Sequence, residues 1–337
     1  MFPLLRLPFL CIQNIFDLLD IIELYNFSLI SKRAKRISKR RKVNELELQL
    51  YSESPSIWIG KKDEWRRPLD FERNRFVIGR RNPPAMDPNV SPFLEALQHF
   101  MEVCRFDSVE FELRPPLTDD QLFTMIDWLN GLKTENISIR SATWPMFELF
   151  MNRFRRSIQK LSFIGQEWNG VIYKHLNFEI KQSFTSNRSD WFNLDFLFSM
   201  DTETITSYDT NLSAEDLNVF LRSWQEGKTN RNLKQVKVTT CSKVDMKKVL
   251  KGCGGEIMDP RTTKLKFRPF RFKWICGGIH IRRNDGRLAV IQNDDCSTWK
   301  KEEDVPENDI ENYLKQLEMW NSEESSWYED TFLCYIF

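Results

Sequence analysis

Residues 7–33 read LPFLCIQNIFDLLDIIELYNFSLISKR, and this pattern predicts short helices at the start of the chain. The apolar side chains between Phe9 and Leu19 fall on nearly every side of a helix, so they predict a helix that is covered on all sides. Asp20 is a good N-cap for a second helix that continues into a basic run. A unit of about 40 residues cannot bury this much apolar surface alone. Either the rest of the chain or another protein must cover it.

The charge of the 337-residue chain is balanced overall but uneven locally. The 49 basic and 48 acidic residues give a net charge of +1, which argues against a protein whose main task is to wrap nucleic acid. Eight of the eleven residues 32–42 are basic, and residues 261–283 hold eight basic residues and no acid. Residues 294–337 carry a net charge of −10. These segments either face each other or face different partners.

The rest of the sequence predicts an α/β fold. Residues 46–80 alternate apolar and polar side chains, as in a short antiparallel meander, and residues 82–92 are a connector rich in proline. From Phe93, strand and helix patterns alternate at intervals near the leucine-rich-repeat period, which favours parallel strands with helical crossovers. The strand patterns are 109–113, 137–139, 161–163, 176–180, 205–207 and 236–238, and the helix patterns are 118–131, 143–156, 191–200 and 213–226. Asp285-Gly286 predicts a hairpin turn, and residues 310–320 predict a last helix.

The sequence shows no pattern of catalytic or metal-binding residues. The seven cysteines are widely spaced without a Cys-x-x-Cys pair, and none of the three histidines lies near a cysteine or another histidine. We therefore expect no catalytic residue, metal or cofactor, and reduced thiols in a cytoplasmic or nuclear protein. The uncharged stretch 7–16 is about half of the ~20 residues that span a bilayer, and Arg6 and the acids that follow do not fit a signal peptide.

The N-terminal stretch resembles an F-box. The resemblance rests on Leu7-Pro8, Ile15, Leu18-Leu19, Leu24, Phe27–Leu29 and Ser31–Arg33. Residues 190–224 are similar to the type 2 F-box-associated domain of a large nematode F-box family, and Ile281–Gly286 resembles a C-terminal motif of the same proteins. Basic residues replace the tryptophan that many F-boxes carry near their end.

The resemblance implies a substrate-recruiting, non-catalytic subunit of an SCF-type ubiquitin ligase. A three-helix F-box (1–45) would bind a Skp-family adaptor, and through it a cullin scaffold. A β-meander and connector (46–92) would lead into a leucine-rich-repeat-like body (93–292) that holds a target protein and includes the F-box-associated domain at 175–240, with an acidic helical tail at 293–337. The residues expected to contact the adaptor are Leu7, Pro8, Ile15, Leu18, Leu19, Leu24 and Leu29.

Two alternatives stay open from the residues alone. The chain could be an F-box-like interaction module outside any ligase, or it could bind nucleic acid through its basic segments. The run 32–42 is better explained as a solvated helix end than as a nuclear-localisation signal. Residues 264–274 are better explained as a half-buried strand with a break at Pro269 than as a base-stacking surface.

Overall fold

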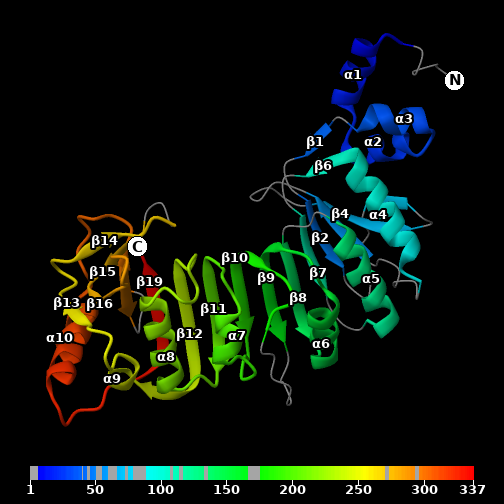
Figure 1. Cartoon of the computed structure of the whole chain (residues 1–337). Helices are drawn as coiled ribbons and strands as arrows, with labels where there is room; N and C mark the ends of the chain where they lie inside the picture. Colours follow the sequence, from blue (N-terminus) through cyan, green and yellow to red (C-terminus); the bar gives the residue numbers. More distant parts are fainter. Residues whose placement is uncertain are drawn as a thin grey trace. The chain divides into compact units, whose positions relative to one another are not determined.

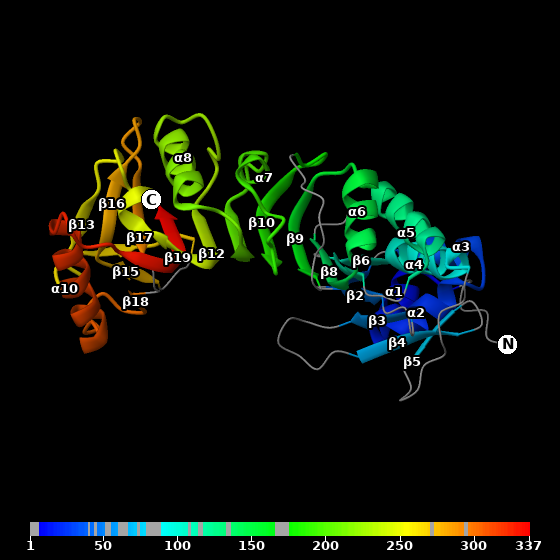
Figure 2. The ribbon, with the colours of Figure 1, turned by 90° about the horizontal axis from the view of Figure 1, so that it is seen from below.

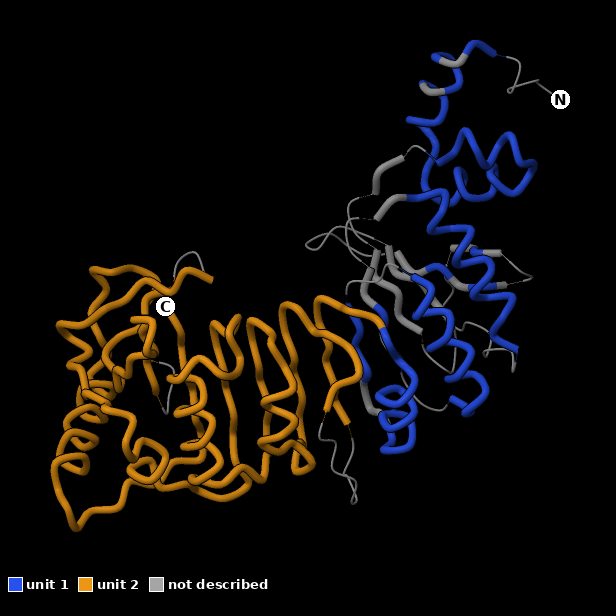
Figure 3. Tube along the Cα trace, in the orientation of Figure 1, with its two compact units in different colours: residues 1–155 blue, residues 156–337 orange. Residues whose placement is uncertain are grey.

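The computed structural model describes most of the chain and divides it into two compact units (Figures 1 and 3). Unit 1 covers residues 1–155 and unit 2 covers residues 156–337. The described residues are 7–39, 41–43, 46–50, 55–59, 67–72, 75–78, 89–106, 109–113, 117–132, 136–165, 175–269, 273–292 and 296–337.

Unit 1 begins with three short helices, α1 (Phe9–Leu18), α2 (Ile21–Ser28) and α3 (Lys32–Ser38). As predicted, Asp20 caps α2, where its side chain and that of Glu23 form a reciprocal capping box. The second helix does not continue into the basic run, because Ser31 is extended and its hydroxyl accepts a hydrogen bond from the Ala34 amide at 3.1 Å. The basic run therefore starts a helix of its own.

The predicted meander is present in the sheet of unit 1, whose strand order is β8-β7-β2-β3-β4-β5. The four meander strands pair antiparallel, whereas β7 and β8 extend the sheet in parallel from β2. Most of the predicted connector at 82–92 lies outside the described residues. The strands are β2 (Leu46–Leu50), β3 (Pro55–Ile59), β4 (Arg67–Glu72), β5 (Arg75–Ile78), β7 (Val109–Leu113) and β8 (Asn136–Ala142).

Three longer helices accompany this sheet: α4 (Ser91–Val103), α5 (Asp119–Gly131) and α6 (Trp144–Arg153). Helices α5 and α6 correspond to predicted helices and lie side by side (Figure 2). Helix α4 was not predicted, although Pro92 in its first turn is a helix-start signal. A separate parallel pair joins β1 (Arg41–Val43) to β6 (Cys104–Phe106).

Unit 2 contains four consecutive parallel strands: β9 (Ile158–Gly165), β10 (Ile180–Asn187), β11 (Thr204–Thr210) and β12 (Gln235–Asp245). Short helix α7 (Leu194–Phe198) and helix α8 (Ala214–Gln225) form two of the connections. The strand predicted at 176–180 is misplaced, because β10 begins only at Ile180. The buried side chains of β10 are Ile180, Phe184 and Ser186. Helix α7 is shorter than the predicted helix 191–200.

The C-terminal part corrects the predicted acidic helical tail. Helix α10 (Glu307–Asn321) is present, but Tyr328–Ile336 form β19, which lies antiparallel between β12 and β17 (Leu288–Gln292). Five consecutive residues, 332–336, are buried. An uninterrupted apolar run of this kind suits a strand covered on both faces.

The remaining strands of unit 2 include the predicted hairpin. Strand β16 (Gly278–Arg282) pairs antiparallel with β17 across the turn at Asp285-Gly286, where Gly286 has a φ of 91°. Strand β13 (Glu256–Met258) is the outer neighbour of β16. A three-stranded sheet is formed by β14 (Lys264–Lys266), β15 (Trp274–Cys276) and β18 (Ser297–Thr298), and α9 (Met246–Val249) follows β12. No helix within the described ranges is both long enough and apolar enough to cross a membrane.

Candidate functional site

The first three helices expose large apolar side chains to solvent. The exposed fractions are 71% for Leu10, 85% for Leu18, 46% for Leu29 and 72% for Ile30. We call these four residues the apolar face. Leu10 and Leu18 lie on α1, and Leu29 and Ile30 lie between α2 and α3, so all four fall within 21 residues of the chain.

The opposite side of α1 is packed into unit 1. Ile12 and Phe16, one turn apart, are 3% and 8% exposed, and the ring of Phe16 lies 4.9 Å from that of Phe27. Leu10 and Leu18 are eight residues apart and therefore share the other side of the helix. The all-round apolar pattern of α1 thus divides into one side that the chain covers and one that it leaves exposed.

The structure places the seven predicted contact residues in three different environments. Leu18, Leu29 and Pro8 are exposed, whereas Leu7, Ile15 and Leu19 are half-buried. Leu24 is corrected: it is 1% exposed and belongs to the core, because α2 turns it toward the interior together with Tyr25 and Ser28. Leu10 and Ile30, which were not among the predicted contact residues, are exposed as well. The eight-residue spacing between Leu10 and Leu18 places both on one side of α1.

Contacts with α4 and β5 fix the short helices in unit 1. The buried ring of Tyr25 lies 5.7 Å from Phe76, 5.6 Å from His99 and 5.2 Å from Phe100. Burial raises the pKa of Tyr25 to about 12, so the side chain is neutral at physiological pH. The Ser28 hydroxyl donates to the Tyr25 carbonyl at 2.6 Å, and its oxygen lies 2.7 Å from Nε2 of His99. These contacts attach α2, which directly precedes Leu29 and Ile30, to α4 and β5.

The basic run 32–42 contributes to the same attachment. Nζ of Lys35 lies 2.8 Å from a carboxylate oxygen of Glu102 on α4, and Nζ of Lys39 lies 3.4 Å from the same oxygen. The hydrogen bond from Lys35 holds the pKa of Glu102 below its usual range. Both side chains are partly exposed, so these pairs contribute little stability and mainly orient α3.

His99 makes the attachment of these helices dependent on pH. Burial, together with the charges of Lys35 and Lys39, lowers the pKa of His99 below its ordinary value. Near pH 6 the unfolded chain therefore binds more protons than the folded one, and the free energy of unfolding decreases as the pH falls through about 6.5. We expect unfolding at about pH 5.5 to need less urea than at about pH 7.5, with a smaller difference in His99→Gln. If the change in urea midpoint between the two pH values is the same in wild type and in His99→Gln, His99 does not contribute to the pH dependence of stability.

Aromatic packing dominates the core around β10 and α7. Trp191 is fully buried, and its ring contacts Phe184 at 6.5 Å, Phe192 at 6.0 Å and Phe196 at 5.0 Å. Beside this cluster, the hydroxyls of Ser186 and Ser207 lie 2.8 Å apart and join neighbouring strands. The buried side chains described in this part of unit 2 are uncharged, so we interpret the cluster as part of the core.

Side-chain amides hold the loops around α8. Asn218 donates to the carbonyls of Val249 and Lys251, both at 2.8 Å, and Gln225 donates to those of Cys253 and Arg282, both at 2.9 Å. Helix α8 starts with a capping box and stops at Gly227, whose φ is 73°. These hydrogen bonds satisfy loop carbonyls and give the residues a structural role.

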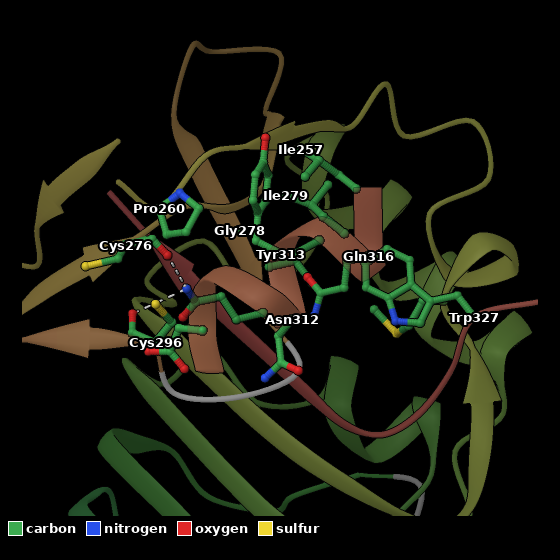
Figure 4. Close-up of a pocket in the computed structure, with 14 residues that line it drawn as sticks. Ile257, Pro260, Cys276, Gly278, Ile279, Cys296, Asn312, Tyr313, Gln316 and Trp327 are labelled. Carbon is green, nitrogen blue, oxygen red and sulfur yellow. Dashed lines mark hydrogen bonds between the residues drawn. The ribbon is translucent and has the colours of Figure 1, made fainter. Parts of the chain in front are cut away.

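A small cavity between α10 and the β16–β17 hairpin is too small for a drug-sized ligand (Figure 4). It measures about 50 Å³, far below the roughly 300–1,000 Å³ of ordinary ligand sites. Gln292 is one of the lining residues, and its amide donates to the Cys276 carbonyl at 2.8 Å and the Cys296 carbonyl at 3.4 Å. A hydrogen bond from the Cys296 thiol lowers the pKa of Cys276 to about 7 and raises that of Cys296. No histidine or carboxylate is hydrogen-bonded to Cys276 in the described residues to serve as its base.

Two family models match the chain at the positions just described. A model described as F-box domain matches residues 4–46, which include α1, α2 and α3. A model described as F-box associated matches residues 172–238, which include β10, α7, β11 and α8. The chain carries an F-box and an F-box-associated domain. It is thus an F-box protein, of a kind that mediates protein interaction, as the sequence resemblance indicated.

No curated protein and no solved structure matches this F-box protein. Its described residues contain no group of three or more His, Cys, Asp or Glu side chains able to hold a metal ion. All seven cysteines are free thiols, and Cys11 and Cys241 are exposed.

Proposed function

We propose that this F-box protein is the substrate-recruiting subunit of an SCF-type ubiquitin ligase. The observation that carries the proposal is the apolar face on α1 and after α2, inside the residues that match the F-box. The chain buries one side of α1 and leaves the other exposed. A Skp-family adaptor that covers Leu10, Leu18, Leu29 and Ile30 would remove this apolar surface from water, which is the main driving force of protein association.

In this proposal the work is divided among the domains. The three helices of residues 1–45 form the F-box, and the exposed Pro8 and the half-buried Leu7, Ile15 and Leu19 add to the surface that meets the adaptor. The strand–helix body, which we interpret as leucine-rich-repeat-like, holds a target protein. The adaptor connects the chain to a cullin scaffold.

The mechanism is proximity rather than catalysis by this chain. Holding the target and the ubiquitin-conjugating enzyme on one scaffold raises the effective concentration of target lysines near the reactive thioester. The contacts of Tyr25, Ser28 and Lys35 with α4 support this role, because they attach α2 and α3 to the rest of unit 1.

The proposal is tested by calorimetry of the purified full chain with a purified Skp-family adaptor. We expect a one-to-one complex whose formation has a negative heat-capacity change, the signature of buried apolar surface. The complex should then co-elute with a cullin. A folded chain that binds no adaptor would contradict the proposal, and a complex that never joins a cullin would favour an interaction module outside the ligase.

A further inference from the structure

A groove in unit 2 collects basic side chains from three separate segments of the chain. Its volume is about 910 Å³, and its lining residues come from the loop before β12, the end of β14 and the residues after it, Arg287, and the end of β19. Its basic lining residues are Arg231, Lys234, Lys266, Arg268 and Arg287. No acidic residue is among the described residues that line it.

Three of these five cations have no acidic partner among the described residues. Lys234 is paired with Glu203 at 2.5 Å, and Arg287 lies 3.6 Å from Asp285. The side chains of Arg231, Lys266 and Arg268 form no such pair, and all three residues are exposed. The groove therefore holds unneutralised positive charge although the whole chain is nearly neutral.

The floor of the groove is apolar and fixed. Leu265 and Phe337 pack on a buried cluster that includes Phe267, and the rings of Phe267 and Phe337 lie 5.6 Å apart. The guanidinium of Arg287 donates to the Arg231 carbonyl at 2.8 Å, which ties two of the lining segments together. An apolar floor with a cationic rim fits a ligand that combines apolar and negatively charged groups.

We propose that this groove binds an acidic segment of the target protein, an extended peptide in which Asp and Glu flank an apolar side chain. The proposal rests on the proposed function for the identity of the partner. Charge complementarity supports a peptide with several carboxylates, and the apolar floor supplies a place for its central side chain. A nucleic acid would use the cations but would gain little from the half-buried apolar side chains of Leu265 and Phe337.

The test measures fluorescence anisotropy of a labelled seven-residue peptide, Glu-Asp-Glu-Leu-Glu-Asp-Glu, with the full chain at low salt. We expect saturable binding that weakens with salt and disappears when the acids are replaced by Gln and Asn. The double variant Lys266→Ala, Arg268→Ala should bind about tenfold more weakly. The matched control Lys243→Ala, Lys300→Ala removes two exposed lysines of unit 2 that do not line the groove, and it should bind like wild type.

The other outcomes separate this inference from the proposed function. If the chain binds the adaptor but not the peptide, the proposal that the groove binds an acidic peptide is wrong, and the proposed ligase function is unaffected. If the chain binds the peptide but not the adaptor, the proposed role of the groove is supported and the proposed ligase function is wrong. The third outcome concerns nucleic acid. If a seven-nucleotide single-stranded RNA binds as tightly as the peptide, and the groove variant no longer binds it, the groove is a nucleic-acid site and the peptide proposal is wrong.

Discussion

Replacing Leu18 and Ile30 together by aspartate is expected to abolish binding of the Skp-family adaptor, with an affinity at least about 100-fold below that of wild type. The two side chains are 85% and 72% exposed in the free chain, so they are available to a partner. In the complex each aspartate would place a carboxylate in an apolar interface without a partner for its charge, which is costly. Calorimetry of wild type and variant under the same conditions measures the difference.

The fold should survive these two substitutions because neither side chain packs in the core. The thermal unfolding midpoint of the variant should stay close to that of wild type. The control Leu314→Asp changes a leucine of α10 that is 51% exposed and lies in unit 2, and it should keep full adaptor affinity. Wild-type affinity in the Leu18→Asp, Ile30→Asp variant would place the adaptor elsewhere and remove the main support for the proposed function.

Replacing Trp191 by alanine should lower the free energy of unfolding of the part of unit 2 around β10 and β11 by about 3–5 kcal/mol. The indole is fully buried, and its ring meets four aromatic neighbours at centroid distances of 5.0–6.5 Å: Phe163, Phe184, Phe192 and Phe196. Aromatic rings cannot close the space left by an indole without leaving their rotamers, so a cavity remains.

Hydrogen exchange of the β10 and β11 amides measures this loss locally and does not require the whole chain to unfold in one step. A loss of 3–5 kcal/mol corresponds to exchange that is roughly 100-fold faster or more. The control Trp299→Ala makes the same chemical change at a residue that is 70% exposed, and it should leave these exchange rates unchanged. Similar rates in the two variants would show that the aromatic cluster does not hold these strands.

Local patterns in the sequence predicted many of the elements. The capping residue Asp20 placed the start of α2, because a side chain that accepts a backbone hydrogen bond acts within four residues. The helix patterns that begin at 118 and 213 agree with α5 and α8, where Thr118 and Ser213 form capping boxes. The Asp285-Gly286 turn placed the β16–β17 hairpin, again because the signal is local. Strand β10 was misplaced because its early residues Lys181 and Gln182 are exposed and conceal the apolar alternation.

The candidate surfaces were predictable only in part. The F-box pattern located the right segment, but it could not separate Leu24, which is buried, from Leu18, which is exposed. Both are leucines on short helices, and the difference depends on how α2 is turned against α4 and β5. The basic groove was not predictable, because its cations come from the segments 231–234, 266–268 and 287.

The sequence by itself determined what depends on neighbouring residues: the α/β class, the helix starts, the meander, the hairpin and the F-box pattern. Only the tertiary structure decided which apolar side chains remain exposed and which cations gather without acids beside them. The physical reason is that capping and alternation act over a few residues, whereas burial and charge clustering depend on elements far apart in the chain. The insertion of β19 between β12 and β17 is the clearest case, since a C-terminal segment taken for part of an acidic tail becomes an interior strand of the sheet.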